Sequence, residues 1–408
     1  MKSSEIADSR QAENGRGTPG EVFGTFLKLG LTSFGGPIAH LGYFRDELVI
    51  RRKWISEAGY ADLVALCQFL PGPASSQVGF ALGLLRGGPL GALAAWAAFT
   101  LPSALILVLF ALGAAAWGGP TGLAVIHGLK IVAVAIVAHA VWGMARSLCP
   151  DRERASIAVG AVIVVVGVAG SFGQVAAILG GGLAGLILCR GAAAPVVGNL
   201  TFRVSRGVAL MALVAFCVLL VGLPLAAAAT GSQTLGLIDA FYRAGSLVFG
   251  GGHVVLPLLE AEVVRPGWVA TDAFLAGYGA AQAVPGPLFT FAAYLGAVMQ
   301  PAPRGILGAG IALVTIFVPG FLLVVAALPF WDDFRTRPNA QAAMRGANAA
   351  VVGVLGAALY SPVFTSAILG PADFALALVG FLLLTMWKTP PWVVVILLAA
   401  GGALIALS

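Results

Sequence analysis

Runs of apolar residues long enough to cross a lipid bilayer recur along almost the whole chain. A crossing helix needs roughly 20 apolar residues. We count thirteen apolar segments, near 22–42, 61–85, 90–117, 121–147, 156–171, 172–190, 207–229, 235–259, 272–299, 304–329, 342–367, 372–387 and 391–407. Only 10% of the 408 residues are charged, far below the roughly 25% of a soluble domain. Because a soluble fold of this size could not bury so much apolar surface, the sequence predicts an all-α polytopic membrane protein.

This prediction excludes a cytosolic enzyme, a nucleic-acid binder and a secreted disulfide scaffold. The net charge of +6 fits a membrane protein that keeps its cations in cytoplasmic loops, so the expected partner is the lipid bilayer and not nucleic acid. The four cysteines form no C-x-x-C pair, and the sequence has neither a P-loop motif nor a spaced His/Cys ligand set. We therefore expect no cofactor, no metal site and no built-in ATPase.

The most informative pattern is an internal repeat. The run FLKLGLTSFGGP from Phe26 returns as FYRAGSLVFGGG from Phe241, and Q-x-x-P-G-P starts at both Gln68 and Gln282. Such self-similarity indicates a duplicated unit. The predicted organisation is a polar tail at 1–21, a first repeat at 22–190, a linker with one transmembrane helix at 191–234 and a second repeat at 235–408.

The segment count predicts how the two repeats are oriented. Six segments precede the linker helix and six follow it, so the second repeat begins on the opposite face and the repeats are inverted, as in many transporters. The loop at 43–60 is rich in Arg and Lys. The positive-inside rule favours keeping this loop in the cytoplasm, which makes the first segments of each repeat re-entrant. The Gly and Pro motifs mark where these helices would break.

Two cations occupy equivalent positions in the first apolar segment of each repeat, Lys28 and Arg243. A charge within a bilayer usually marks a cavity, a partner or a pathway, although both could also reach the membrane interface. Because no intramembrane carboxylate is an obvious partner, the pair suggests an anion as ligand.

Broken helices would complete an anion site, because a helix N-terminus offers N–H donors and a partial positive charge. Lys130 adds a third cation deep in the fourth segment. Simple kinks and helix–helix contacts are the alternative roles for these residues. Besides the three cations, the predicted substrate-binding residues are Phe34, Gly35, Gly36, Gln68, Pro71, Gly72, Pro73, Ser75 and Ser76, and in the second repeat Phe249, Gly250, Gly251, Gln282, Pro285, Gly286, Pro287 and Thr290.

Acidic and imidazole groups beside the breaks are candidates for proton coupling. Glu47 and Glu262 are equivalent, and His40 and His253 also lie near the breaks. A carboxylate with a raised pKa could carry a proton. Loop salt bridges with Arg45 or Arg265 are the alternative.

At these residues the sequence resembles the chromate ion transporter family. The resemblance is carried by FLKLGLTSFGGPIAHLGYFRDELVIRRKWIS at 26–56, QFLPGPASSQ at 68–77, GLKIVAVAI at 128–136 and FGGGHVVLPLLEAEVV at 249–264. It implies a long-chain member of the bacterial inner membrane with duplicated halves of opposite orientation. It also implies efflux of chromate, driven by membrane potential or proton gradient, and hence chromate resistance. The second half departs from the first, with Gly252 in place of Pro37 and Asn348 in place of Lys130.

Three alternatives stay open at this point. The same fold could carry sulfate or another oxyanion, or exchange one for another. A membrane-embedded enzyme acting on lipid phosphates would need a carboxylate or His cluster, which the sequence does not show. A scaffold without transport would leave the cations and the breaks without a purpose. We also consider a second copy of the chain, in a homodimer, as a partner.

Overall fold

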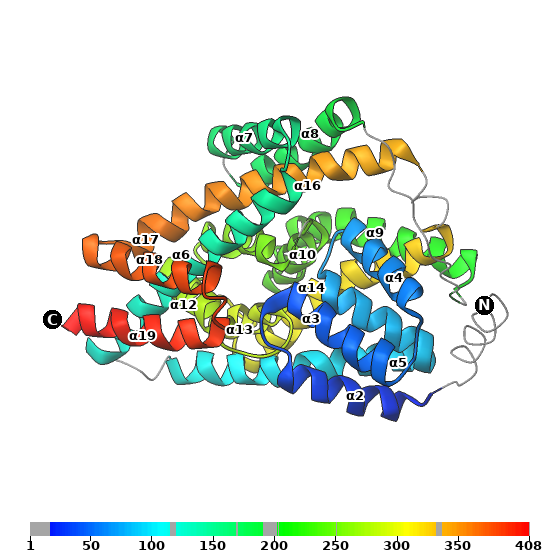
Figure 1. The fold of residues 1–408 in the computed structure, drawn as a ribbon, viewed down its shortest axis with the longest axis horizontal. Coiled ribbons are helices and arrows are strands. Elements are labelled where there is room, and N and C mark those ends of the chain that lie inside the picture. The colour runs from blue at the N-terminus through cyan, green and yellow to red at the C-terminus, as the bar shows by residue number, and fades with distance from the viewer. Residues whose placement is uncertain are drawn as a thin grey trace.

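The computed structural model describes residues 17–114, 120–168, 170–190, 202, 204–249, 251–331 and 337–407. Within these ranges the regular structure is entirely helical (Figure 1). The α-helices are α2 (Pro19–Thr32), α3 (Gly36–Phe44), α4 (Glu57–Phe69), α5 (Ala74–Ala114), α6 (Pro120–Leu148), α7 (Arg152–Gly167), α8 (Ser171–Leu188), α9 (Arg206–Thr230), α10 (Gln233–Ser246), α11 (Val255–Leu259), α12 (Thr271–Ala281), α13 (Phe291–Val298), α14 (Gly305–Ala327), α16 (Pro338–Ala358), α17 (Thr365–Ala367), α18 (Pro371–Thr385) and α19 (Pro391–Leu407).

Five of the described helical spans are long and apolar enough to cross a membrane: Ala74–Gly113, Gly122–Leu148, Arg206–Thr230, Gly305–Phe330 and Pro338–Ala367. Shorter apolar helices accompany them. Most of α9, which lies within the predicted linker, is exposed, and its surface is nearly all hydrocarbon. An exposed apolar helix of this length is stable only in lipid. The chain is therefore an all-α, multi-pass membrane protein; the count of thirteen segments stays a prediction.

The predicted interruptions of the apolar runs are present in both halves. In the first half, α2 ends at Thr32 and α3 begins at Gly36, while the Pro71-Gly72-Pro73 motif separates α4 from α5. Gly35 and Gly72 have positive φ angles of 99° and 126°, which L-residues with a side chain rarely adopt. In the second half the corresponding breaks separate α10 from α11 and α12 from α13. Gly250 lies outside the described residues.

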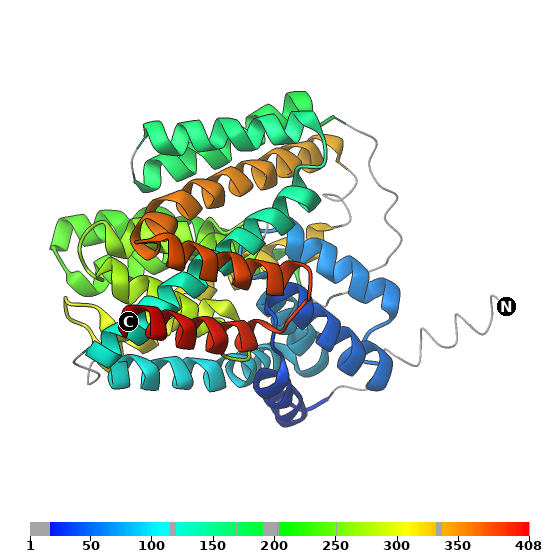
Figure 2. The ribbon, with the colours of Figure 1, turned by 60° about the vertical axis from the view of Figure 1, so that its left-hand side comes forward.

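Helices of the two halves are interleaved. The helix α6 packs against α18 and α19 of the second half, while its equivalent, α16, packs against α7 and α8 of the first half (Figure 2). Gly128 of α6 lies against the backbone of Ala399, and the equivalent Gly346 lies against the backbone of Gly181. Neither glycine leaves room for a Cβ atom, so small residues allow the close approach of these helices. Each half thus completes the packing of the other.

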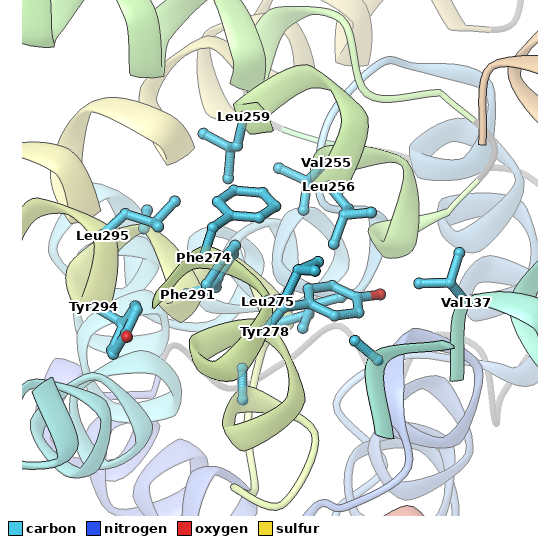
Figure 3. Close-up of a cluster of buried hydrophobic side chains, with 14 of the residues drawn as sticks. Val137, Val255, Leu256, Leu259, Phe274, Leu275, Tyr278, Phe291, Tyr294 and Leu295 are labelled. Carbon is cyan, nitrogen blue, oxygen red and sulfur yellow. The ribbon is translucent and has the colours of Figure 1, made fainter. Parts of the chain in front are cut away.

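The largest buried cluster belongs mainly to the second half. Figure 3 shows its aromatic centre, where Phe274 and Tyr278 of α12 meet Phe291 of α13. The Phe274 and Phe291 rings make an edge contact with centroids 5.2 Å apart, a favourable geometry for aromatic pairs. A second cluster joins α2, the π-helix Arg45–Arg51, α4 and the first part of α5.

Candidate functional site

The four break motifs meet through a reciprocal pair of backbone hydrogen bonds. The amide of Gly286 donates to the carbonyl of Ser33 at 2.9 Å, and the amide of Gly72 donates to the carbonyl of Val248 at 2.7 Å. Ser33 and Val248 are equivalent positions of the repeat, as are Gly72 and Gly286. The P-G-P motif of each half therefore binds the F-G-G break of the other half. We call this region the crossing.

Close packing at the crossing leaves no room for a side chain at Gly72 or Gly286. A Cβ atom on Gly286 would lie 2.7 Å from Ser103 Oγ, and one on Gly72 would lie 3.0 Å from the Cα of Gly320. Ser103 and Gly320 are again equivalent positions, in α5 and α14. The side-chain amide of Gln77 donates to the carbonyls of Pro71 and Gly320, at 2.9 and 3.0 Å. These bonds tie the first P-G-P motif to the second half.

The two predicted cations both have carboxylate partners, so the expectation that they lack one was wrong. Lys28 Nζ lies 3.2 Å from Glu47 Oε2. Arg243 pairs with Asp239 one turn earlier and lies 3.4 Å from Glu262. The chain folds back after each break and brings the equivalent carboxylates, Glu47 and Glu262, to the equivalent cations. The repeat aligned Lys28 with Arg243 and Glu47 with Glu262, but this alignment alone did not show that the cations and carboxylates meet in space.

Glu47 sits among three cations. Besides Lys28, it forms an ion pair with Arg51 at 2.7 Å and accepts a hydrogen bond from Arg52 at 2.8 Å. Burial alone would raise the pKa of Glu47, but the hydrogen bonds from Arg52 and Lys28 hold this pKa below its ordinary value. Arg45 pairs with Glu57 instead of Glu47. This environment keeps the Glu47 carboxylate ionised, which disfavours a role as a proton carrier.

A different carboxyl group in the second half has the opposite tendency. Burial raises the pKa of Glu260, even though Arg265 lies 3.4 Å away and partly opposes the shift. Sequence reasoning chose Glu262 as the coupling candidate because it matches Glu47. The neighbouring Glu260 has an environment more suitable for carrying a proton, and only its burial in the structure reveals this.

Lys130 and His253 have partners in α12, whereas His40 lies beside Ser75 at the start of α5. Lys130 is buried and its Nζ lies 2.7 Å from Asp272 at the start of α12. His253 Nδ1 lies 2.7 Å from the hydroxyl of Tyr278. His40 is fully buried and its Nδ1 lies 3.4 Å from Ser75 Oγ. Both histidines follow an F-G-G break, and His40 also lies next to another predicted residue, Ser75.

The remaining predicted residues divide between the crossing and its surroundings. Gln68 is exposed, whereas Gln282 is partly buried and its Nε2 has no hydrogen-bond partner among the described residues. The hydroxyl of Thr290 donates to the carbonyl of Pro287 at 2.8 Å. The Phe34 ring faces Trp392, with centroids 6.5 Å apart. Residues of the breaks themselves are Gly35, Gly36, Pro71, Gly72, Pro73, Phe249, Gly251, Pro285, Gly286 and Pro287.

Comparison with known proteins gives a consistent result. The model of the family described as "Chromate transporter" matches residues 20–186 and 235–404. A probable chromate transport protein of Synechococcus elongatus is 30% identical over 393 residues, covering 92% of this chain and 93% of the relative. A chromate transport protein of Pseudomonas aeruginosa is 30% identical, covering 94% and 91%, and that of Cupriavidus metallidurans is 29% identical with the same coverage. No solved structure matches the chain.

Proposed function

Because the chain belongs to the chromate transporter family, whose model matches it across two repeats, we propose that it exports chromate from the cytoplasm. Export would be driven by the membrane potential or the proton gradient, and it would confer chromate resistance on the cell. An anion that leaves a negative-inside cell gains roughly 2.3 kcal/mol per charge per 100 mV. The protein would act in the bacterial inner membrane.

The reciprocal hydrogen bonds at the crossing carry the proposal. Ser33 with Gly286 and Val248 with Gly72 form two equivalent contacts that an exchange of the halves would interconvert. In transporters with inverted repeats, the substrate binds where broken helices of the two repeats meet. The helices α3 and α5 begin at this place, and helix N-termini favour anions. Inverted orientation and a substrate site at the crossing together account for this arrangement.

Lys28 and Arg243 contribute to the proposed function without binding the substrate directly. Lys28 and Arg243 already neutralise carboxylates, so an oxyanion would have to compete with those partners for direct contact. Lys28 is 53% exposed and can attract anions at longer range. We propose that these two cations, together with Lys130, Gln68 and Gln282, shape the approach to the crossing.

A difference between the halves supports alternating access. In the second half, α12 packs against α6. Gly279 contacts the backbone of Leu129, and Asp272 forms an ion pair with Lys130. The equivalent pair, α4 and α16, lacks such packing, and Ala65, which is equivalent to Gly279, is exposed. We propose that α12 and α4 dock in turn, so that one side of the crossing closes when the other opens.

The test is chromate uptake into inverted membrane vesicles, in which export appears as accumulation in the lumen. Vesicles with the protein are compared with vesicles that lack it, with and without a lumen-positive potential. We expect protein-dependent accumulation that increases with the potential. Accumulation of sulfate but not chromate would move the function to another oxyanion, and indifference to both potential and proton gradient would contradict the proposed driving force.

A further inference from the structure

The two halves of the crossing make equivalent backbone hydrogen bonds but differ in the polarity of their side chains. In the first half, buried polar side chains surround the crossing: Ser33, His40, Ser75, Ser76, Thr100 and Ser103, each at most 3% exposed. The equivalent positions of the second half are Val248, Val255, Phe289, Thr290, Phe317 and Gly320. Five of these six residues carry no polar side-chain atom, and the hydroxyl of the sixth, Thr290, is bonded to a backbone carbonyl. Duplication alone would have made the two sets alike.

Contacts tie the polar side chains to one place. The His40 ring lies beside Ser75 and makes an edge contact with Phe99 of α5 at 5.3 Å. Next along α5, the hydroxyl of Ser103 donates to the carbonyl of Thr100 at 3.0 Å. A Cβ atom on Gly286 would touch Ser103, and the amide of Gly286 donates to Ser33. These contacts connect Ser33, His40, Ser75, Thr100 and Ser103 with one end of the crossing, and Ser76 follows Ser75 in α5.

Several of these groups have no hydrogen-bond partner among the described residues. They are Ser33 Oγ, His40 Nε2, Ser76 Oγ and Thr100 Oγ1. Buried polar groups without partners are costly and rare in native proteins. Four of them near the two breaks of the first half indicate a ligand that supplies acceptors. If Ser75 donates to Nδ1 of His40, the other ring nitrogen carries the proton and can donate as well.

Backbone donors point to the same place. In α5 the first helical hydrogen bond runs from Gln77 N to the carbonyl of Pro73, so the amides of residues 74–76 lie ahead of it. The N-cap residue of α3 is Gly35, which has no side chain that could cap the first amides of the helix. Two helix N-termini and a set of hydroxyls can replace the water shell of a tetrahedral oxyanion.

We propose that the polar side chains of the first half hold the oxyanion directly, with Ser33, Ser76 and Thr100 as hydroxyl donors and His40 as a neutral N–H donor. This inference rests on the proposed function and names the ligands of the same site. The substrate is bound by neutral donors and helix ends, and not by the paired cations. Neutral donors suit a transporter, because its substrate must bind well enough to enter and weakly enough to leave. The apolar second half then supplies packing at the crossing, and each protein binds one oxyanion there.

A matched pair of substitutions tests the proposal. Thr100→Val removes an unpartnered buried hydroxyl and keeps the shape of the side chain. Thr25→Val does the same in α2, where the hydroxyl donates to the carbonyl of Glu21 at 2.8 Å and the side chain is equally buried. Hydrogen bonds to charged groups are strong enough that Thr100→Val should raise the KM for chromate uptake about tenfold or more. Thr25→Val should leave this KM at the wild-type value.

The melting temperature separates a binding role from a structural one. Thr100→Val should leave the melting temperature unchanged or raise it, because the buried hydroxyl has no partner to lose. Thr25→Val should lower it slightly. Ser76→Ala is a second variant for which we also expect a raised KM and an unchanged melting temperature. A wild-type KM in both Thr100→Val and Ser76→Ala would overturn the proposal while chromate transport stands.

A failure of the proposed function would give a different result, namely no chromate accumulation by the wild-type protein. If wild-type vesicles accumulate no chromate, sulfate is titrated into the purified protein by calorimetry. Sulfate binding that is weakened about tenfold by Thr100→Val and not by Thr25→Val would uphold the oxyanion site without chromate export. Equal binding by all three proteins, or none, would overturn the site as well.

Discussion

Replacing Gly286 with alanine tests the crossing most directly. Gly286 has a φ of 100°, and forcing a residue with a side chain into such a region costs about 1–3 kcal/mol. The added Cβ would also lie 2.7 Å from Ser103 Oγ and 3.2 Å from the carbonyl oxygen of Phe99. Overpacking of this kind costs about 1–3 kcal/mol. Gly286→Ala should therefore lower the free energy of unfolding by about 2–6 kcal/mol and reduce transport, because the hydrogen bond to Ser33 must lengthen.

A double-mutant cycle with Ser103→Ala separates the two contributions. Removing Ser103 Oγ deletes the nearest atom, so the double variant should be less destabilised than the sum of the single variants by about 1–3 kcal/mol. Unfolding is followed by tryptophan fluorescence during denaturation in mixed micelles. Gly231→Ala serves as the control, because Gly231 has a φ of 61° with no neighbour within 4 Å, and should lose only about 1–2 kcal/mol. Strict additivity, or a Gly286→Ala protein as stable as Gly231→Ala, would refute the packing argument.

Three further predictions concern charged pairs. Asp272→Asn should weaken the docking of α12 on α6 by up to about 1 kcal/mol, because Lys130 is buried but Asp272 is exposed to solvent screening. Adding Lys130→Met should restore stability in the same denaturation assay, and a further loss would contradict the pairing. The pKa of Glu47 lies below its ordinary value of 4.5, so its contribution to stability is full above that pH and disappears as the pH falls through the lowered pKa. The Glu47→Gln protein should therefore be less stable than wild type at pH 7, and this difference should shrink toward pH 3. A difference that stays constant with pH would be evidence against the charged pairing. Lys28→Ala should slow chromate uptake only a few-fold, with the effect vanishing at high salt; complete loss of uptake at every salt concentration would mean that Lys28 contacts the substrate.

The sequence alone predicted the parts of the fold that depend on local pattern. Apolar runs indicated membrane helices, and Gly35 with the P-G-P motifs marked the breaks because backbone preference is a local property. The duplicated motifs revealed two repeats. These features need no knowledge of which segments meet in space.

The parts that depend on tertiary contact were not accessible in this way. The pairing of Lys28 with Glu47 requires the chain to turn back after the break, and burial of Glu260 depends on the packing of its π-helix against α10, α11 and α12. Arg243 and Asp239 are one helical turn apart, so this pair could have been predicted from spacing alone. The repeat alignment shows the polar residues of the first-half crossing, among them His40 and Thr100. Only the structure reveals that their side chains are buried with polar atoms that lack a hydrogen-bond partner among the described residues, which sets them apart from ordinary helix residues.

The contrast between the halves bears on how a duplicated transporter can work. Alternating access needs two halves that can adopt each other's conformations, and the equivalent backbone contacts of Gly72 and Gly286 preserve that ability. Substrate binding needs no such equivalence, because a single oxyanion at the crossing can be held by donors from one side. Selection on the backbone and on the side chains can therefore diverge. The P-G-P motifs stay paired across the repeats, while Thr100 of one half is replaced by Phe317 at the equivalent position of the other. A polar second half would add buried groups that one small anion could not satisfy, and each would lower stability.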